Sequence, residues 1–113
     1  MSALKYWLWL SSIRGLGAAR ATELVDAFGS PEDIFISDPE VWMETTELSE
    51  PVLTDMKARS TDRAERILEL CSNSGINILT MQDAIYPMRL REIYAPPIVL
   101  YYKGSLPDRK SVV

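Results

Sequence analysis

The chain contains no histidine and only one cysteine, Cys71, among its 113 residues. Without histidine there is no His-based acid–base catalysis and no Ser–His or Cys–His nucleophile pair, and most kinds of zinc site are excluded. A single cysteine cannot form an internal disulfide, so a reducing cytoplasm is the natural setting. Cys71 continues an apolar stripe at helical spacing, and we interpret it as a buried structural thiol rather than a reactive one.

The sequence also lacks the motifs of membrane proteins, secreted proteins and several enzyme classes. No apolar run approaches the roughly 18 residues of a membrane span. The apolar run from Tyr6 to Leu10 is ended by Ser11, Ser12 and Arg14 and lacks a small-residue cleavage site, so it predicts a helix rather than a signal peptide. The sequence has no Walker loop, no GxGxxG motif and no nucleophile elbow. We therefore expect no catalytic residues, no cofactor, no metal and no membrane association.

Acidic residues are concentrated in the middle of the chain, whose net charge is −4. Residues 31–58 hold eight acidic residues and one lysine, a net charge of −7, whereas residues 1–30 carry +1, residues 59–75 carry 0 and residues 76–113 carry +2. Most of these acids follow predicted helix starts, where the helix dipole favours them, so a solvated face is the default interpretation. A docking face for a basic protein is the main alternative to it. The acidic middle repels phosphate, so nucleic acid would be met by the ends of the chain.

The first 74 residues predict a compact set of helices. Three helices are predicted from apolar stripes: Leu4–Trp7–Leu8, Ala21–Leu24–Val25–Phe28 and Ala64–Ile67–Leu68–Cys71. Three short helices are predicted between them, because Ser30-Pro31, Ser37-Asp38-Pro39 and Ser49-Glu50-Pro51 each combine a capping side chain with an early proline. Gly29 and Gly75 are expected to end the second and last of these helices. We expect β-structure to begin just after that, over residues 76–79.

The segment Ile13-Arg14-Gly15-Leu16-Gly17 matches the hGhG turn of helix-hairpin-helix modules. Gly15 and Gly17 would let the backbone approach a phosphate, and the following helix would present free N–H groups and its positive dipole end. Arg14 and Arg20 would add positive charge. These four residues, Arg14, Gly15, Gly17 and Arg20, are our candidate DNA-binding residues. The alternative is that the two glycines only form a tight turn between helices.

Six aromatic residues are candidates for stacking on nucleic-acid bases. They are Tyr6, Trp7, Trp9, Trp42, Tyr101 and Tyr102. Core packing or a subunit contact is the favoured interpretation for the set, with Trp7 and Trp42 as core residues. Trp9 lies off the main apolar stripe and is expected to be exposed.

The most specific pattern lies in residues 86–104. Pro87 suits the first turn of a short helix of about two turns, on which Leu90 and Ile93 share one face. Pro96-Pro97 ends that helix, and the β-branched and aromatic run 98–102 predicts a strand. Gly104 then permits a turn. On physical grounds alone, this unit is equally consistent with a simple docking arm around a core.

This run resembles the YPxxLxxIxxPPxxLYxxG signature of the DNA-processing protein A family (DprA, also called Smf). The matching positions are Tyr86, Pro87, Leu90, Ile93, Pro96, Pro97, Leu100, Tyr101 and Gly104. Ala95 stands where many members carry Asp. The upstream residues 75–80 and the N-terminal residues 7–31 are also similar to the family, so the resemblance covers about residues 4–104.

The resemblance implies a mainly α fold. Residues 1–74 would form a small helical domain of the sterile-alpha-motif-like (SAM-like) or helix-hairpin-helix type, and residues 75–113 a short α/β segment that opens a truncated Rossmann-like domain. Lys110-Ser111-Val112-Val113 would begin the next strand. In the family, the loop that follows this strand lies in the main single-stranded DNA site. The resemblance therefore implies an N-terminal fragment without that loop.

The resemblance also implies a function without enzymatic turnover. DprA-like proteins bind incoming single-stranded DNA in natural transformation, protect it and help to load the recombinase RecA. They act in the cytoplasm as homodimers, whose contacts lie mainly in the Rossmann-like domain. The competing hypothesis is a protein-interaction module with no nucleic-acid role, which the acidic segment 31–58 favours. An enzyme subdomain is the third and least favoured hypothesis, because the chain lacks histidine and any nucleophile motif.

Overall fold

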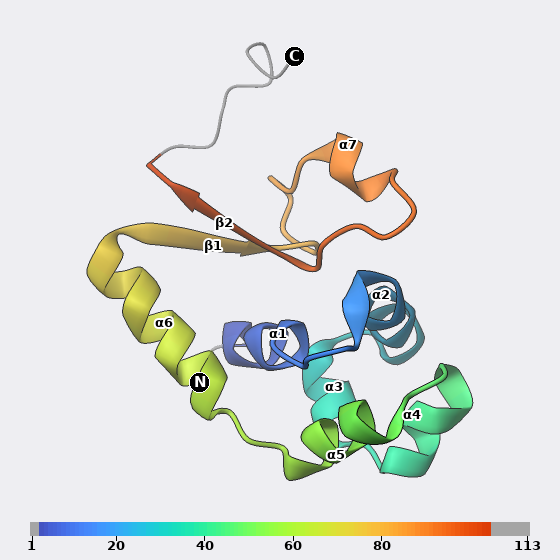
Figure 1. The fold of residues 1–113 in the computed structure, drawn as a ribbon. Helices are drawn as coiled ribbons and strands as arrows, with labels where there is room; N and C mark the ends of the chain where they lie inside the picture. Colours follow the sequence, from blue (N-terminus) through green and yellow to red (C-terminus); the bar gives the residue numbers. More distant parts are fainter. Residues whose placement is uncertain (1–2, 105–113) are drawn as a thin grey trace.

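The computed structural model describes residues 3–104, which form seven helices and a two-stranded sheet (Figure 1). The elements are α1 (Leu4–Ser11), α2 (Gly17–Phe28), α3 (Pro31–Ile36), α4 (Pro39–Thr45), α5 (Glu50–Ala58), α6 (Asp62–Ser74), β1 (Ile76–Thr80), α7 (Met88–Arg91) and β2 (Val99–Lys103). The mainly helical prediction is confirmed, and both expected strands are present. The strand predicted at residues 110–113 lies outside the described residues.

The three short helices begin where proline predicted them. At α3 the Ser30 hydroxyl oxygen accepts a hydrogen bond from the Asp33 backbone N–H at 3.3 Å, and Pro31 follows in the first turn. The α4 and α5 helices also have proline in their first turn, but the side chains of Asp38 and Ser49 make no capping hydrogen bond within residues 3–104. Proline therefore marks all three starts, whereas a side-chain cap forms at α3 alone among them.

The α1 helix lies at the centre of the core, and the prediction that Trp9 is exposed is wrong. Trp9 is 1% exposed, and its ring lies edge-on to Phe35 with centroids 5.0 Å apart and 6.5 Å from the ring of Trp42. The physical reason is that α1 packs against α2, α3, α6 and β2 together, so its buried surface extends around the helix. A single apolar stripe therefore underestimates what α1 buries.

The sheet packs on the helices through both strands, β1 against α6 and β2 against α1. The strands β1 and β2 are antiparallel, with Ile76 opposite Lys103 and Thr80 opposite Val99. Ile98 and Val99 belong to the same apolar core as the buried residues of the helices. In Figure 1 the sheet lies between α1 and the segment that carries α7. The division into domains 1–74 and 75–113 stays a prediction, because one core joins the two parts within the described residues.

The predicted length of α7 is wrong. It has four residues, about one turn, instead of two turns, and Ile93 lies beyond its end with 49% of its surface exposed. Met88 is 74% exposed as well, so the segment buries no apolar face that would sustain a second turn. Leu90 and Ile93 therefore do not form a buried helical stripe.

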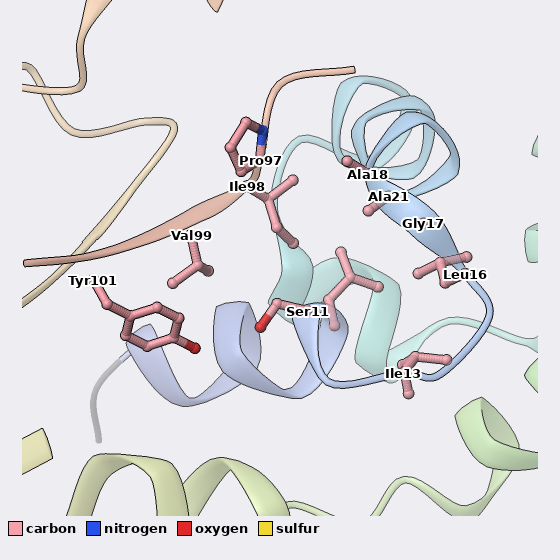
Figure 2. A pocket seen from close by; sticks show the side chains of 11 residues that line it. Ser11, Ile13, Leu16, Gly17, Ala18, Ala21, Pro97, Ile98, Val99 and Tyr101 are labelled. Atoms are coloured by element: carbon pink, nitrogen blue, oxygen red, sulfur yellow. The ribbon is translucent and has the colours of Figure 1, made fainter. Parts of the chain in front are cut away.

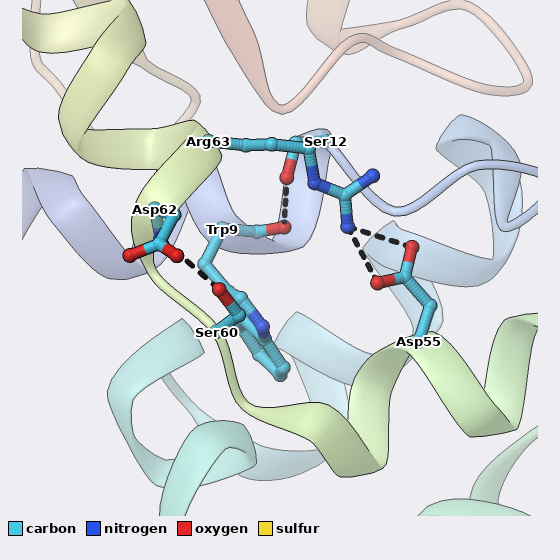
Figure 3. Close-up of polar contacts among 6 residues, drawn as sticks. All are labelled: Trp9, Ser12, Asp55, Ser60, Asp62 and Arg63. Carbon is cyan, nitrogen blue, oxygen red and sulfur yellow. Dashed lines mark hydrogen bonds and ion pairs between the residues drawn. The ribbon is translucent and has the colours of Figure 1, made fainter.

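A two-pronged ion pair joins α5 to α6 (Figure 3). One guanidinium nitrogen of Arg63 donates to both carboxylate oxygens of Asp55, at 2.5 and 2.7 Å. Both side chains are partly exposed, so we expect about 1 kcal/mol or less from the pair. Cys71 on α6 is buried, as predicted. Over residues 3–104, no helix has the length and apolar character to cross a membrane, and no group of three or more potential metal ligands occurs.

Candidate nucleic-acid interface

The turn between α1 and α2 holds the hGhG residues, and two of them are buried while two are exposed. Ile13 and Leu16 point into the core, at 4% and 1% exposure, while Arg14 and Gly15 are exposed between them. Gly15 and Gly17 have φ angles of +86° and +80°, in the left-handed region that side chains disfavour. The two apolar residues thus anchor the turn, and its glycine backbone faces outward.

The two glycines differ in what surrounds them. A Cβ atom at Gly15 would lie 3.1 Å from Cγ2 of Val52, so this glycine also allows the turn to approach α5. A Cβ atom at Gly17 would meet nothing within 4 Å. Gly15 therefore has a packing role, as in the tight-turn interpretation. Gly17 leaves open space beside the first residues of α2, where an anion would meet free backbone N–H groups.

Arg14 and Arg20 are exposed, and within residues 3–104 neither makes an ion pair or a hydrogen bond. Arg20, on α2, lines two hollows. The first, of about 340 Å³, is also lined by Gly15 and Ser49, and the second, of about 440 Å³, by Thr45 and Tyr94. Arg20 is therefore free to meet an anion in these hollows, whereas Arg14 lines neither of them.

Two carboxylates share this region with Arg20. Glu47 lines both hollows and Glu23 lines the second. The Thr46 hydroxyl donates to Glu23 Oε1 at 2.7 Å, which ties α2 to the end of α4. Glu47 is exposed and has no hydrogen bond or ion pair within the described part of the chain. The electrostatics are thus mixed, with Glu47 the carboxylate most able to oppose a phosphate.

The Tyr86-Pro87 half of the signature is joined to the Pro96-Pro97 half by a partly buried hydrogen bond. Tyr86 is 4% exposed, and its hydroxyl donates to the Pro97 carbonyl at 2.6 Å. The Arg91 guanidinium lies 5.2 Å from the centre of the Tyr86 ring and donates to the Asp83 carbonyl at 2.7 Å. Burial raises the pKa of Tyr86, and the nearby Arg91 charge acts against that rise. Within the described residues, this half of the signature is structural.

The remaining signature residues differ in burial, and Ile93 is 49% exposed. Pro87 precedes α7, Pro96 is buried, and Leu90 and Leu100 are partly buried. The Gly104 carbonyl accepts a hydrogen bond from the Asn77 side chain at 3.1 Å, which holds the end of β2 against β1.

The signature and the hairpin meet at an apolar hollow of about 290 Å³ (Figure 2). Gly17, Ala18 and Ala21 line it from α2, and Pro97 and Tyr101 line it from the sheet. The pKa of Tyr101 is raised chiefly by burial, with the Ser11 hydroxyl acting in the opposite direction. Gly17, Pro97 and Tyr101 therefore lie around one hollow, whereas Arg14 is not among the residues lining it.

Sequence reasoning missed Tyr94, which lines the second hollow with Arg20. It is 93% exposed, the highest value among the exposed large apolar residues of the described chain. One feature of the sequence could have pointed to Tyr94: it is an aromatic residue shortly before Pro96-Pro97 that does not share the helical face of Leu90 and Ile93. The sequence gives no indication that this residue lies near α2.

We expect Tyr86→Phe to lower the free energy of unfolding by about 1 kcal/mol near neutral pH, because the partly buried Pro97 carbonyl loses its donor. The raised pKa also makes the folded state hold the Tyr86 proton more tightly than the unfolded chain does. That contribution is complete below pH 10, the ordinary pKa of tyrosine, and falls as the pH rises above it.

Urea unfolding at about pH 8 and about pH 11 measures both effects, because these values lie on either side of the unfolded-state pKa. The wild type should lose more stability between the two than Tyr86→Phe does. Tyr94→Phe is the matched control, since its hydroxyl is exposed and its removal should change neither value. Equal losses in wild type and Tyr86→Phe would contradict the raised pKa.

Comparison with known proteins gives two matches. The sequence model of the family described as DNA recombination-mediator protein A matches residues 77–113, which contain most of β1, the Tyr86–Pro97 segment and β2. "Protein Smf" of Synechocystis sp. (strain ATCC 27184 / PCC 6803 / Kazusa) is 30% identical over 107 residues, which cover 94% of this chain and 27% of that protein. No solved structure matches. The chain thus spans about a quarter of the length of this curated relative, and the similarity includes the helical part as well as the signature.

Proposed function

Because this chain belongs to the DNA recombination-mediator protein A (DprA/Smf) family, we propose that it is part of a recombination mediator that binds single-stranded DNA. The whole protein protects incoming DNA in natural transformation and helps to load RecA in the cytoplasm, without chemical turnover. It acts as a homodimer. The helices α1–α6 form a SAM-like or helix-hairpin-helix unit, and β1, α7 and β2 open a Rossmann-like domain that holds the main DNA site.

Within this function, the chain itself contributes an auxiliary DNA contact at the turn between α1 and α2. The observation that carries this proposal is the pairing of two exposed arginines, Arg14 and Arg20, with an open backbone at Gly17. Both cations lack an intramolecular partner within residues 3–104, in a chain whose net charge is −4. Two phosphate contacts give weak, salt-dependent binding.

Fluorescence anisotropy of a labelled single-stranded oligonucleotide, titrated with the 113-residue chain, tests this contact. We expect binding that weakens as salt rises, and the double variant Arg14→Glu/Arg20→Glu should bind no oligonucleotide at physiological salt. Each lost phosphate contact should reduce the slope of log K against log salt by about 0.7. The control Lys57→Glu/Arg66→Glu makes the same change in net charge at exposed positions on α5 and α6. Equal loss of binding in both double variants would refute a local contact.

The second candidate function is a protein-interaction module. The exposed acidic side chains of residues 31–58 favour it, as does Ile36, which is 71% exposed at the end of α3. Titrating the chain with RecA in parallel with DNA separates the two candidates. Binding to RecA together with no DNA binding at low salt would favour the interaction module.

A further inference from the structure

We propose that Tyr94 and Arg20 form a subsite for one nucleotide of single-stranded nucleic acid, in which the tyrosine ring stacks on the base and the guanidinium pairs with the phosphate. The inference rests on the proposed DNA-binding function and adds to it a base contact, which the hairpin alone does not offer. It brings together two residues that are 74 positions apart in the sequence and line one hollow.

The state of Tyr94 is unusual for a large aromatic residue. Tyrosine is generally part-buried in folded proteins, whereas this ring is 93% exposed and has no ring contact or hydrogen bond within residues 3–104. Its position is nevertheless fixed from both sides. The buried Pro96 lies two residues after it, and the Arg91 side chain, three residues before it, is bonded to the Asp83 carbonyl. The segment thus presents an unpacked aromatic face on an anchored backbone.

The hollow beside Tyr94 contains a cation that can pair with a phosphate, and its lining also includes the carboxylates of Glu23 and Glu47. Its volume is about 440 Å³, and Arg20 supplies the cation. The hydroxyls of Thr45 and Thr46 donate to the Val41 carbonyl and to Glu23, so only their oxygens can accept hydrogen bonds from a ligand. Arg20 also lines the neighbouring hollow beside Gly15, so the two hollows flank this one side chain. A single strand crossing from the hairpin turn would place a phosphate near Arg20 and a base near Tyr94. Stacking accepts every base, which suits a protein that binds strands of any sequence.

A substitution of Glu47 can distinguish a nucleotide subsite from a site for a basic protein. Glu47 lines both hollows and lacks an intramolecular partner within the described chain, whereas Glu23 is held by the Thr46 hydroxyl. A free carboxylate beside a phosphate opposes binding, so Glu47→Gln should strengthen binding of a nucleic acid. The same change would weaken binding of a basic protein segment. The sign of the effect therefore reports the class of ligand.

The experiment compares a labelled oligothymidylate with an abasic oligonucleotide of equal length, at low salt. We expect Tyr94→Ala to weaken oligothymidylate binding by about fivefold or more, because stacking contributes roughly 1–3 kcal/mol per base. The same variant should bind the abasic strand as the wild type does. Tyr94→Phe keeps the aromatic face and should match the wild type on both probes, while Arg20→Gln should weaken both.

The second part of the experiment removes one negative charge from the hollows with Glu47→Gln. Its control is Glu44→Gln, since Glu44 is exposed on α4 but does not line either hollow. Glu47→Gln should tighten both probes, and Glu44→Gln should leave them unchanged. Unchanged oligothymidylate binding in Tyr94→Ala, or weaker binding in Glu47→Gln, would overturn the subsite. If that happens while Arg14→Glu/Arg20→Glu still abolishes binding, the hairpin contact stands without the subsite. No binding of either probe by the wild type would overturn both proposals.

Discussion

Replacing Trp42 by alanine is expected to lower the free energy of unfolding by about 4 kcal/mol, a large part of the roughly 5–15 kcal/mol of a typical domain. Trp42 is fully buried at 0% exposure, and its indole N–H donates to the Ile34 carbonyl at 2.7 Å. The ring also lies near Trp9 and under the guanidinium of Arg59, 5.1 Å from its centre. Truncation therefore creates a cavity and removes one of the two hydrogen bonds to the Ile34 carbonyl, the other coming from the Ser37 backbone N–H at 3.2 Å.

Urea unfolding followed by far-UV circular dichroism measures this loss without relying on the fluorescence of the tryptophans. Met43→Ala is the matched control, because Met43 is the next residue on α4 and is 47% exposed, so we expect its midpoint to stay close to the wild type. Trp42→Phe keeps a ring but removes the indole N–H, so its midpoint should fall between the two. A midpoint for Trp42→Ala near that of Met43→Ala would contradict the role of Trp42 in the core.

The position of Trp42 also decides which variants are useful for the DNA experiments. Its helix leads directly into Thr45, Thr46 and Glu47, which line the hollow shared by Arg20 and Tyr94. Loss of the Trp42 anchor should displace that wall and weaken binding without removing any contact to DNA. Substitutions at exposed positions such as Tyr94 and Glu47 leave the core intact, so their effects on binding can be attributed to the site.

Local sequence signals predicted α1 to α6 well, because those signals act over a few residues. The Ser30-Pro31 start of α3 is one example, since both the cap and the proline are adjacent to the helix that they begin. Trp9 shows where such reasoning fails. Its burial depends on how many elements surround α1, and a stripe on one helix carries no information about the number of its neighbours.

In the candidate site, too, local features could be predicted from the sequence and long-range contacts could not. The turn at Gly15 and Gly17 could be predicted from spacing, because two glycines between helices constrain the backbone locally. The bond from Tyr86 to the Pro97 carbonyl spans 11 residues, and the shared hollow of Arg20 and Tyr94 joins α2 to the loop after α7. Neither follows from periodicity or propensity, since both depend on how the segment between β1 and β2 folds back on the molecule.

Arg59 is the second residue whose removal should have a large effect, although the sequence indicated only that it lies just before a helix. It is the one non-glycine residue with positive φ, at +49°, among residues 3–104. Its side chain donates from Nε to the Phe35 carbonyl at 2.8 Å and from a terminal nitrogen to the Ser37 carbonyl at 2.5 Å. One cation thus satisfies two carbonyls at the C-terminal end of α3 while stacking on Trp42.

We expect Arg59→Ala to lower the free energy of unfolding by about 2–3 kcal/mol, because two charge-assisted hydrogen bonds and the stacking on Trp42 are lost together. Arg59→Gly loses the same contacts but relieves the left-handed backbone, so it should be about 1 kcal/mol more stable than Arg59→Ala. Urea unfolding of the three proteins gives these differences. If Arg59→Gly is as stable as the wild type, the contacts of the Arg59 side chain only offset the cost of its left-handed backbone, and the predicted loss is refuted. Arg59→Lys should remain near Arg59→Ala, because an ammonium group lacks the planar fork that reaches both carbonyls at once.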